Sequence, residues 1–247
     1  MSDLNWIPST TFGASGFETE WLTVNAARQG GDGSAEALNK ICRTYWYPLY
    51  AYVRGKGFDV HDAQDLTQEF FSQLLTRPWL QDIHSSKGKF RAFLLAAMNN
   101  FLANEWRRTK TQKRGGNTEV FSLDAVEAES RFKLEPWHNE SPDRLFDRSW
   151  AMTVLENASA QLRQECFLSG KTELFESLKT SLSGDKSGER YADVAERLGL
   201  SEDAVKKAAQ RMRDRYQEIV RAEIAQTLMN PAEATGETEF ILKELHN

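Results

Sequence analysis

The chain has 247 residues and a formal net charge of -5, and 40% of its residues are hydrophobic and 27% charged. This length suffices for one large domain or two small ones, and seven tryptophans with fourteen phenylalanines argue against a disordered chain. The sequence contains neither a run of about eighteen apolar residues nor a signal peptide, so we expect a cytoplasmic protein without a membrane span.

The first part of the chain is predicted to be helical. A loose lead-in contains one short helix at 19–29 and ends in a glycine-rich turn. A longer helix is predicted over 34–53, with Pro48 dividing or kinking it. The next helix begins at Asp59 or His61, and a proline closes it about five turns later.

This second long helix has an apolar face and a polar stripe. Its apolar residues recur at three- and four-residue spacing, at Ala63, Leu66, Phe70 and Leu74. Acidic and amide side chains lie off that face, at Asp62, Gln64, Asp65, Gln68 and Glu69. Such a stripe can meet a basic protein surface, but it is also what the solvated face of an ordinary helix looks like.

The segment 87–114 combines an amphipathic helix with most of the local positive charge. Its apolar positions are Phe90, Phe93, Leu94, Ala97, Met98, Phe101 and Leu102. Eight basic residues stand against the single acid Glu105, which gives the segment a charge of +7 in an acidic protein. This excess indicates a phosphate-facing surface, with a solvated charged face beside a core helix as the alternative.

The rest of the chain is predicted to form a linker and a second helical lobe. Residues 115–141 have weak periodicity and scattered acids, and we interpret them as a linker with local structure at most. Helices follow at 142–162 and 172–182. With no convincing strand pattern, the predicted fold is all-α, with domains at 1–114 and 142–247 on either side of the linker.

The pattern of a helix-turn-helix lies near the end of the chain. One helix ends at Gly199, which allows a tight turn, and Ser201 is a suitable N-cap for the next helix. Small residues on the inner faces let the two helices cross closely, at Ala195, Ala208 and Ala209. The outer face carries basic and amide side chains that suit the major groove of DNA. The alternative is a helical hairpin that only packs.

Three segments together match a known order of motifs. They read DAQDLTQEFFSQLL at 62–75, FRAFLLAAMNNFLANEWRR at 90–108 and YADVAERLGLSEDAVKKAAQRMRDR at 191–215. In order and spacing they resemble the extracytoplasmic-function (ECF) sigma factors of bacterial RNA polymerase. The stretches 45–54 and 221–227 resemble a long-linker subgroup of that family. The resemblance implies a sigma factor that binds core polymerase and directs promoter-specific initiation.

The resemblance also implies roles for the first two segments. The acidic helix would bind the clamp helices of the polymerase's largest subunit through Asp62, Gln64, Asp65, Gln68 and Glu69. The basic segment would melt and read the promoter's upstream-ten element through Lys89, Arg91, Asn100, Asn104, Arg107 and Arg108. Asn100 would contact a flipped base, although an asparagine alone is more typical of a turn or helix end. Trp106 would more often pack between helices than stack on a base.

The third segment would read the upstream thirty-five element. Its assigned residues are Ser201, Lys206, Lys207, Gln210, Arg211 and Arg213. The segment departs from the family pattern, because Asp203 and Ala204 replace a Gly-Thr pair and Asp214 interrupts the basic face. The base-reading residues are therefore less defined than the phosphate contacts. The acidic linker would occupy the RNA exit path, where its charge can mimic nucleic acid.

Other functions find less support. The histidines are dispersed and no nucleotide-binding or metal-binding motif occurs, so we expect no enzymatic activity, no metal and no cofactor. The main alternative is a helix-turn-helix transcriptional regulator that forms no holoenzyme. The tail 231–247 has a weak apolar face at Phe240, Ile241 and Leu245, which would pack on the second lobe or bind a regulator such as an anti-sigma factor.

Overall fold

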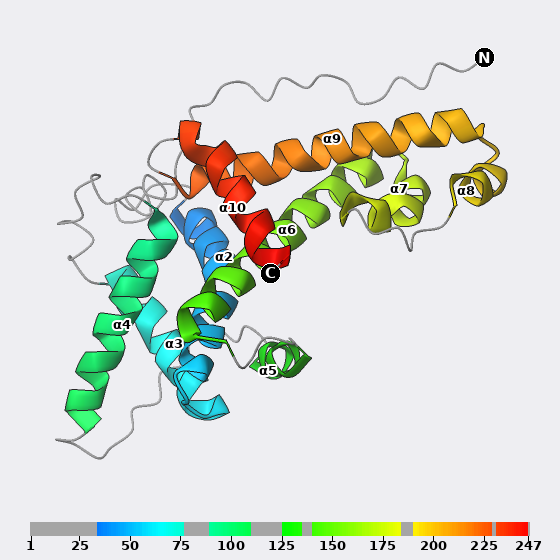
Figure 1. The fold of residues 1–247 in the computed structure, drawn as a ribbon. Coiled ribbons are helices and arrows are strands. Elements are labelled where there is room, and N and C mark those ends of the chain that lie inside the picture. Colours follow the sequence, from blue (N-terminus) through cyan, green and yellow to red (C-terminus); the bar gives the residue numbers. More distant parts are fainter. Residues whose placement is uncertain are drawn as a thin grey trace. The chain divides into compact units, whose positions relative to one another are not determined.

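The computed structural model is helical apart from turns and one isolated bridge in the residues that it describes (Figure 1). These residues are 34–76, 89–109, 125–134, 140–183, 190–228 and 231–246. The all-α prediction is confirmed, whereas the helix predicted at 19–29 lies outside the described residues.

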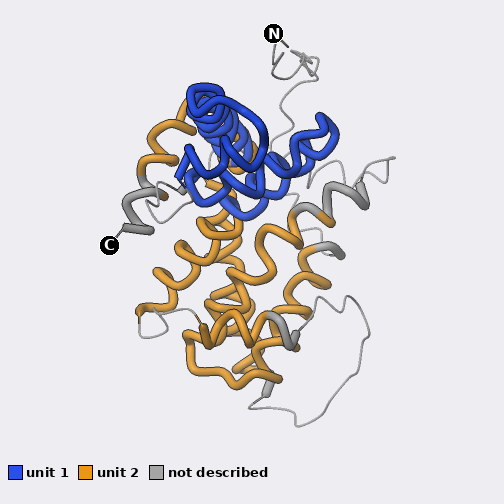
Figure 2. The backbone as a smooth tube through the Cα atoms, turned by 90° about the vertical axis from the view of Figure 1, so that its right-hand side faces the viewer, with its two compact units in different colours: residues 1–17, 154–223 blue, residues 18–153, 224–247 orange. Residues whose placement is uncertain are grey.

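The chain divides into two compact units (Figure 2). Among the described residues, unit 1 comprises 154–223, and unit 2 comprises 34–153 together with 224–246. Unit 2 therefore joins the C-terminal tail to the first helices of the chain. This differs from the expectation that the tail packs on the second lobe.

Unit 2 contains most of the described helices. They are α2 (Ser34–Gly55), α3 (Val60–Thr76), α4 (Phe90–Thr109), α5 (Ala125–Leu134), the first turns of α6 (Pro142–Leu168), the 3-10 turn η3 (Pro231–Glu233) and α10 (Ala234–His246). Unit 1 contains the rest of α6, then α7 (Thr172–Leu178), the 3-10 turn η2 (Lys179–Ser183), α8 (Tyr191–Leu198) and most of α9 (Glu202–Gln226).

Helix α2 is continuous through Pro48, so of the two predicted effects, a division or a kink, the division does not occur. Proline lacks the N–H that would bond to the carbonyl of Thr44, which weakens the helix at this turn. The residues around it are completely buried, including Tyr45, Leu49 and Tyr50. Helices in proteins owe most of their stability to such packing, and here the packing outweighs the lost hydrogen bond.

Aromatic side chains join α2, α3 and α4 into the core of unit 2. Tyr45 of α2 meets Phe90 of α4 edge to face, with ring centroids 5.4 Å apart. Phe70 of α3 meets Phe101 of α4 in the same way at 5.7 Å. Most of the apolar face predicted for 90–102 is buried, and Phe93 is half-buried. This packing turns the remaining faces of α3 and α4 toward solvent.

Gly55 ends α2 where the start of α6 approaches it. A methyl group at this position would lie 2.6 Å from Leu145 Cδ1 and 3.3 Å from Pro142 Cα. Because the Pro142 backbone has little freedom to move, Gly55→Ala is expected to lower the free energy of unfolding by about 1–3 kcal/mol, measured by urea denaturation. At Gly236 in α10 a methyl group meets nothing within 4 Å, so Gly236→Ala is the control and should stabilise by about 0.5–1 kcal/mol. An unchanged stability of Gly55→Ala would contradict the close approach.

Candidate functional site

The polar stripe of α3 faces solvent. Asp59 begins the helix as expected, because its Oδ1 accepts the N–H of Asp62 at 2.8 Å. The opposite face is buried at Ala63, Thr67, Phe70 and Leu74. Of the predicted polymerase-binding residues, Asp62, Asp65 and Glu69 are exposed, and Gln64 and Gln68 are half-buried. The structure thus presents a row of carboxylates that a basic protein surface can reach.

Two adjacent asparagines of α4 have different surroundings. Asn99 Oδ1 accepts a hydrogen bond from the Tyr52 hydroxyl of α2 at 2.5 Å, which ties that amide to the core of unit 2. The Asn100 side chain is exposed and makes no hydrogen bond to the described residues. Its amide therefore keeps a donor and an acceptor for an external partner.

The last turns of α4 are also exposed. Arg107 Nη1 donates to Asn104 Oδ1 at 3.5 Å, and both side chains face solvent. Trp106 is 63% exposed, so the expectation that it packs between helices is wrong. The buried face of α4 ends at Leu102, one turn earlier, and leaves the indole on the surface. The side chain of Arg108 lies outside what the structure describes.

The two predicted DNA-binding cations at the start of α4 are engaged within the protein. Arg91 is only 6% exposed, and its guanidinium donates to Asp147 Oδ1 at 2.9 Å and lies 4.7 Å from the centre of the Trp150 ring. It also pairs with Glu237 of α10 at 2.5 Å, and Lys89 pairs with the other oxygen of the same carboxylate. Sequence reasoning missed Glu237, because no motif in the tail points to α4.

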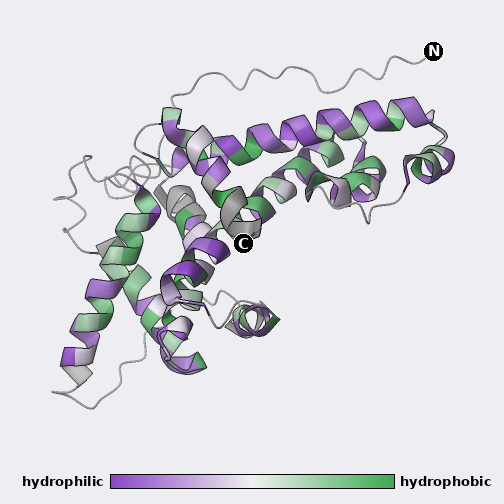
Figure 3. Ribbon diagram, in the orientation of Figure 1, coloured by the Kyte–Doolittle hydropathy of each residue, from purple (hydrophilic) through white to green (hydrophobic). Residues whose placement is uncertain are grey.

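The turn between α8 and α9 forms as predicted. Gly199 has φ 63° and ψ 31°, the left-handed conformation that closes a helix, and its N–H bonds back to α8. Ser201 caps α9, since its Oγ accepts the N–H of Ala204 at 3.2 Å. Apolar and small residues between the helices are buried, at Val194, Ala195, Val205, Ala208, Ala209 and Met212. The outer face of α9 is left to polar residues, and the helix is hydrophilic over much of its length (Figure 3).

Two cations on this outer face are well placed for an external anion. Lys207 and Arg211 are exposed, one turn apart, and neither makes a side-chain hydrogen bond or ion pair with the described residues. Lys206 instead pairs with Glu202 at 2.8 Å, and this hydrogen bond raises the pKa of the ammonium group.

The remaining outer residues make contacts within unit 1. Arg213 donates to the Tyr191 hydroxyl at 3.2 Å and to Gln210 Oε1 at 2.9 Å, which ties α9 to α8. Gln210 also donates to Asp214 at 2.8 Å. Asp214, which interrupts the basic face, therefore holds the amide that would otherwise be available to a base edge.

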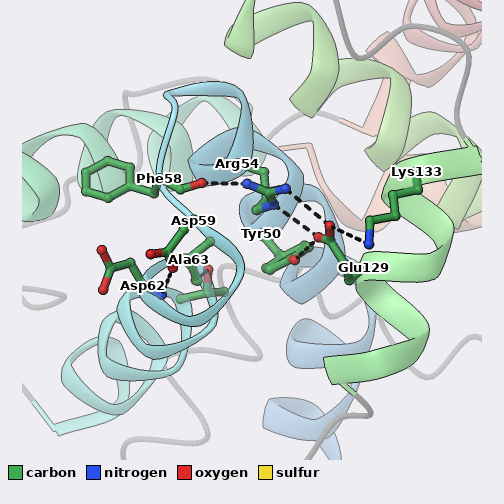
Figure 4. A network of polar contacts seen from close by, with 9 residues as sticks. Tyr50, Arg54, Phe58, Asp59, Asp62, Ala63, Glu129 and Lys133 are labelled. Atoms are coloured by element: carbon green, nitrogen blue, oxygen red, sulfur yellow. Dashed lines mark hydrogen bonds and ion pairs between the residues drawn. The ribbon is translucent and has the colours of Figure 1, made fainter.

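A buried carboxylate joins α5 to α2 (Figure 4). Glu129 accepts hydrogen bonds from the Tyr50 hydroxyl at 2.6 Å and from Arg54 at 3.1 and 3.2 Å. Burial alone would raise the pKa of Glu129, but the hydrogen bonds from Arg54 and Tyr50 outweigh it and lower the pKa. Lys133 lies 3.6 Å away at the exposed edge. The stretch 115–141, predicted as a linker, thus contains a helix anchored on α2.

Comparison with protein families gives a match over most of the chain. A family model described as "ECF sigma factor" matches residues 24–222. No curated protein and no solved structure matches the chain. Within the described ranges, no helix has the length and apolar character needed to cross a membrane, and no group of three or more His, Cys, Asp or Glu residues could hold a metal ion.

Proposed function

Because the chain belongs to the ECF sigma factor family, we propose that it binds bacterial core RNA polymerase through α3 and promoter DNA through α4 and α9. The protein is an RNA polymerase sigma factor that directs transcription initiation. The observation that supports the assignment of surfaces is the extent of the match, since residues 24–222 include all three helices up to the last turn of α9.

The same extent argues against a regulator that binds DNA without forming a holoenzyme. Such a protein needs only the unit formed by α8 and α9. The exposed carboxylates of α3 and the exposed amide of Asn100 would then have no use. A sigma factor uses both, because it must hold the polymerase and also capture bases of the opened strand.

Promoter-specific run-off transcription tests the proposal. The purified protein is added to bacterial core polymerase with a library of promoter fragments, and the start sites are mapped. A sigma factor produces new start sites that core polymerase alone does not use. Binding of the free protein to duplex DNA without new start sites would favour the regulator instead.

Charge reversal on α3 tests the polymerase contact. Asp65→Lys is expected to weaken holoenzyme assembly about tenfold, because an exposed lysine would face the basic surface that this stripe is proposed to meet. Competition with a labelled sigma factor for core polymerase measures the affinity. Glu239→Lys makes the same charge change at an exposed position of α10 and should assemble normally. Unaltered assembly of Asp65→Lys would reject this contact.

Neutralising the outer cations of α9 tests the contact with duplex DNA. Lys207→Ala and Arg211→Ala should each reduce the salt dependence of promoter binding by a slope of about 0.9, as expected for one lost phosphate contact. Electrophoretic binding assays of the holoenzyme at several salt concentrations measure that slope. Arg213→Ala is the comparison, since it should mainly loosen the contact of α9 with Tyr191 and lower thermal stability.

A further inference from the structure

A buried carboxylate of the C-terminal helix lies on the two cations that begin α4. The side chain of Glu237 is 4% exposed, and its two oxygens face different partners, Arg91 on one side and Lys89 on the other. One anion held between two cationic side chains is also how proteins hold a phosphate group. Glu237 therefore occupies the position that a phosphate would take if Lys89 and Arg91 bound DNA.

The backbone just before α10 adds to this contact. The carbonyl of Thr227 accepts the N–H of Phe90 at 3.0 Å, and Leu228 forms an isolated antiparallel bridge with Lys89. The segment between α9 and α10 thus binds the first N–H of α4, at the end of the helix whose N–H groups and dipole favour an anion.

The described side chains of α10 attach it through both apolar and ionic contacts. Of its side chains that the structure describes, Ala234 and Ile241 are the buried apolar ones, and Thr235, Gly236 and Glu239 are exposed. Glu237 is buried as well, and its ion pairs with Arg91 and Lys89 attach α10 to the start of α4. An anion that competes for Lys89 and Arg91 would remove this ionic attachment.

The local charge becomes positive when Glu237 leaves. Lys89 and Arg91 carry two positive charges, and Glu237 and Asp147 carry two negative ones, so the cluster is neutral with α10 in place. Without Glu237 it has a net charge of +1 and stands at the start of a 20-residue helix. The uncovered cluster would then attract a phosphodiester.

We propose that α10 is a removable cover whose Glu237 carboxylate stands in for a promoter phosphate, so that Lys89 and Arg91 bind DNA only after α10 has moved away. This inference rests on the proposed function, because it regulates the same upstream-ten surface. The competing explanation is a permanent ion-pair tie that holds α4, α6 and α10 together. The two explanations predict opposite effects of neutralising the Glu237 carboxylate on promoter opening: a gain if α10 is a cover, and no gain if the ion pairs are a permanent tie.

Glu237→Gln is the test variant, and it is compared with the wild type. Glu239→Gln is the control, because it makes the same change at an exposed glutamate of the same helix. Open complexes of each holoenzyme are quantified over a series of KCl concentrations. If α10 is a cover, Glu237→Gln should form about three- to tenfold more open complex at a given salt concentration. Glu239→Gln should match the wild type.

If the Glu237→Gln holoenzyme opens promoters no better than the wild type, the proposal that α10 is a removable cover is wrong. Run-off transcription by the wild type would show that the proposed sigma function stands even in that case. If the wild type does not initiate transcription, both the proposed sigma function and the cover are contradicted. Hydrogen exchange on the wild-type holoenzyme gives an independent test that needs no variant to fold. The amides of 234–246 should lose protection when promoter DNA is added, and retained protection would reject displacement of α10.

Discussion

Holoenzyme carrying Asn100→Ala is expected to open promoters about ten- to hundredfold more slowly than the wild type, with little change in its affinity for core polymerase. The exposed amide of Asn100 offers both a donor and an acceptor to a base edge, and alanine offers neither. A base contact of this kind contributes about 1–3 kcal/mol, which is about five- to 160-fold in rate and brackets the expected effect. Stopped-flow fluorescence with a base analogue in the upstream-ten element measures the opening rate.

Asn99→Ala is the matched control, since it makes the same change one residue earlier on the same helix. The amide of Asn99 serves the Tyr52 hydroxyl, so its loss leaves a partly buried donor without this acceptor. We expect Asn99→Ala to lower the free energy of unfolding by about 1–2 kcal/mol. It should change the opening rate much less than Asn100→Ala does. Equal loss of opening and of core binding in Asn100→Ala would count against base recognition.

The features that the sequence predicts well are those set by neighbours along the chain. Apolar spacing places the buried faces of α3 and α4, and a serine after a glycine places the turn before α9 at Ser201. Such features depend on residues within one or two helical turns of each other. The exposed stripe of α3 follows from them, because residues off the apolar face have only solvent to meet.

The features that the sequence does not predict depend on residues far apart. The Arg54–Glu129 contact joins positions 75 residues apart, inside a stretch that looks like a linker. Likewise, nothing near Glu237 indicates that it reaches Lys89 and Arg91. A count of basic residues in 87–114 treats every cation as available, but the fold neutralises those whose partners come from other segments. Charge patterning alone thus overestimates the surface that is open to phosphate.

Glu129→Gln is expected to lower the free energy of unfolding at neutral pH by about 2–3 kcal/mol, as loss of one member of a buried charged pair does. The side chain of Glu129 is 10% exposed, so glutamine would leave the Arg54 guanidinium without its countercharge in a largely buried place. Urea denaturation followed by circular dichroism measures the difference. Lys133→Ala is the control, because Lys133 is 71% exposed and its ion pair should contribute less than about 0.5 kcal/mol.

Acid should abolish the advantage of the wild type over Glu129→Gln. Folding lowers the pKa of Glu129 from its ordinary value of 4.5, so the ionised carboxylate stabilises the fold above that value and this contribution disappears as the pH falls through the folded pKa. The difference in unfolding free energy should therefore be constant above about pH 5 and shrink below it. A difference that stays constant into acid would show that the neutral form of the side chain serves equally well.

This pH dependence also decides how the proposed role of the linker should be tested. If the ionised form of Glu129 holds α5 on α2, a deletion of 120–140 removes a stabilising contact of unit 2 together with the acidic stretch. A change in abortive initiation would then have two causes. Of the four acidic residues of 115–141 that lie outside α5, Glu140 pairs with Arg144 and Arg148 and is kept. Replacing the other three, Glu119, Asp124 and Glu135, by their amides leaves the anchor intact and lowers the charge proposed to mimic nucleic acid. An altered pattern of abortive transcripts in that variant would assign the effect to the linker charge. An unchanged pattern would contradict the proposal that this charge mimics nucleic acid.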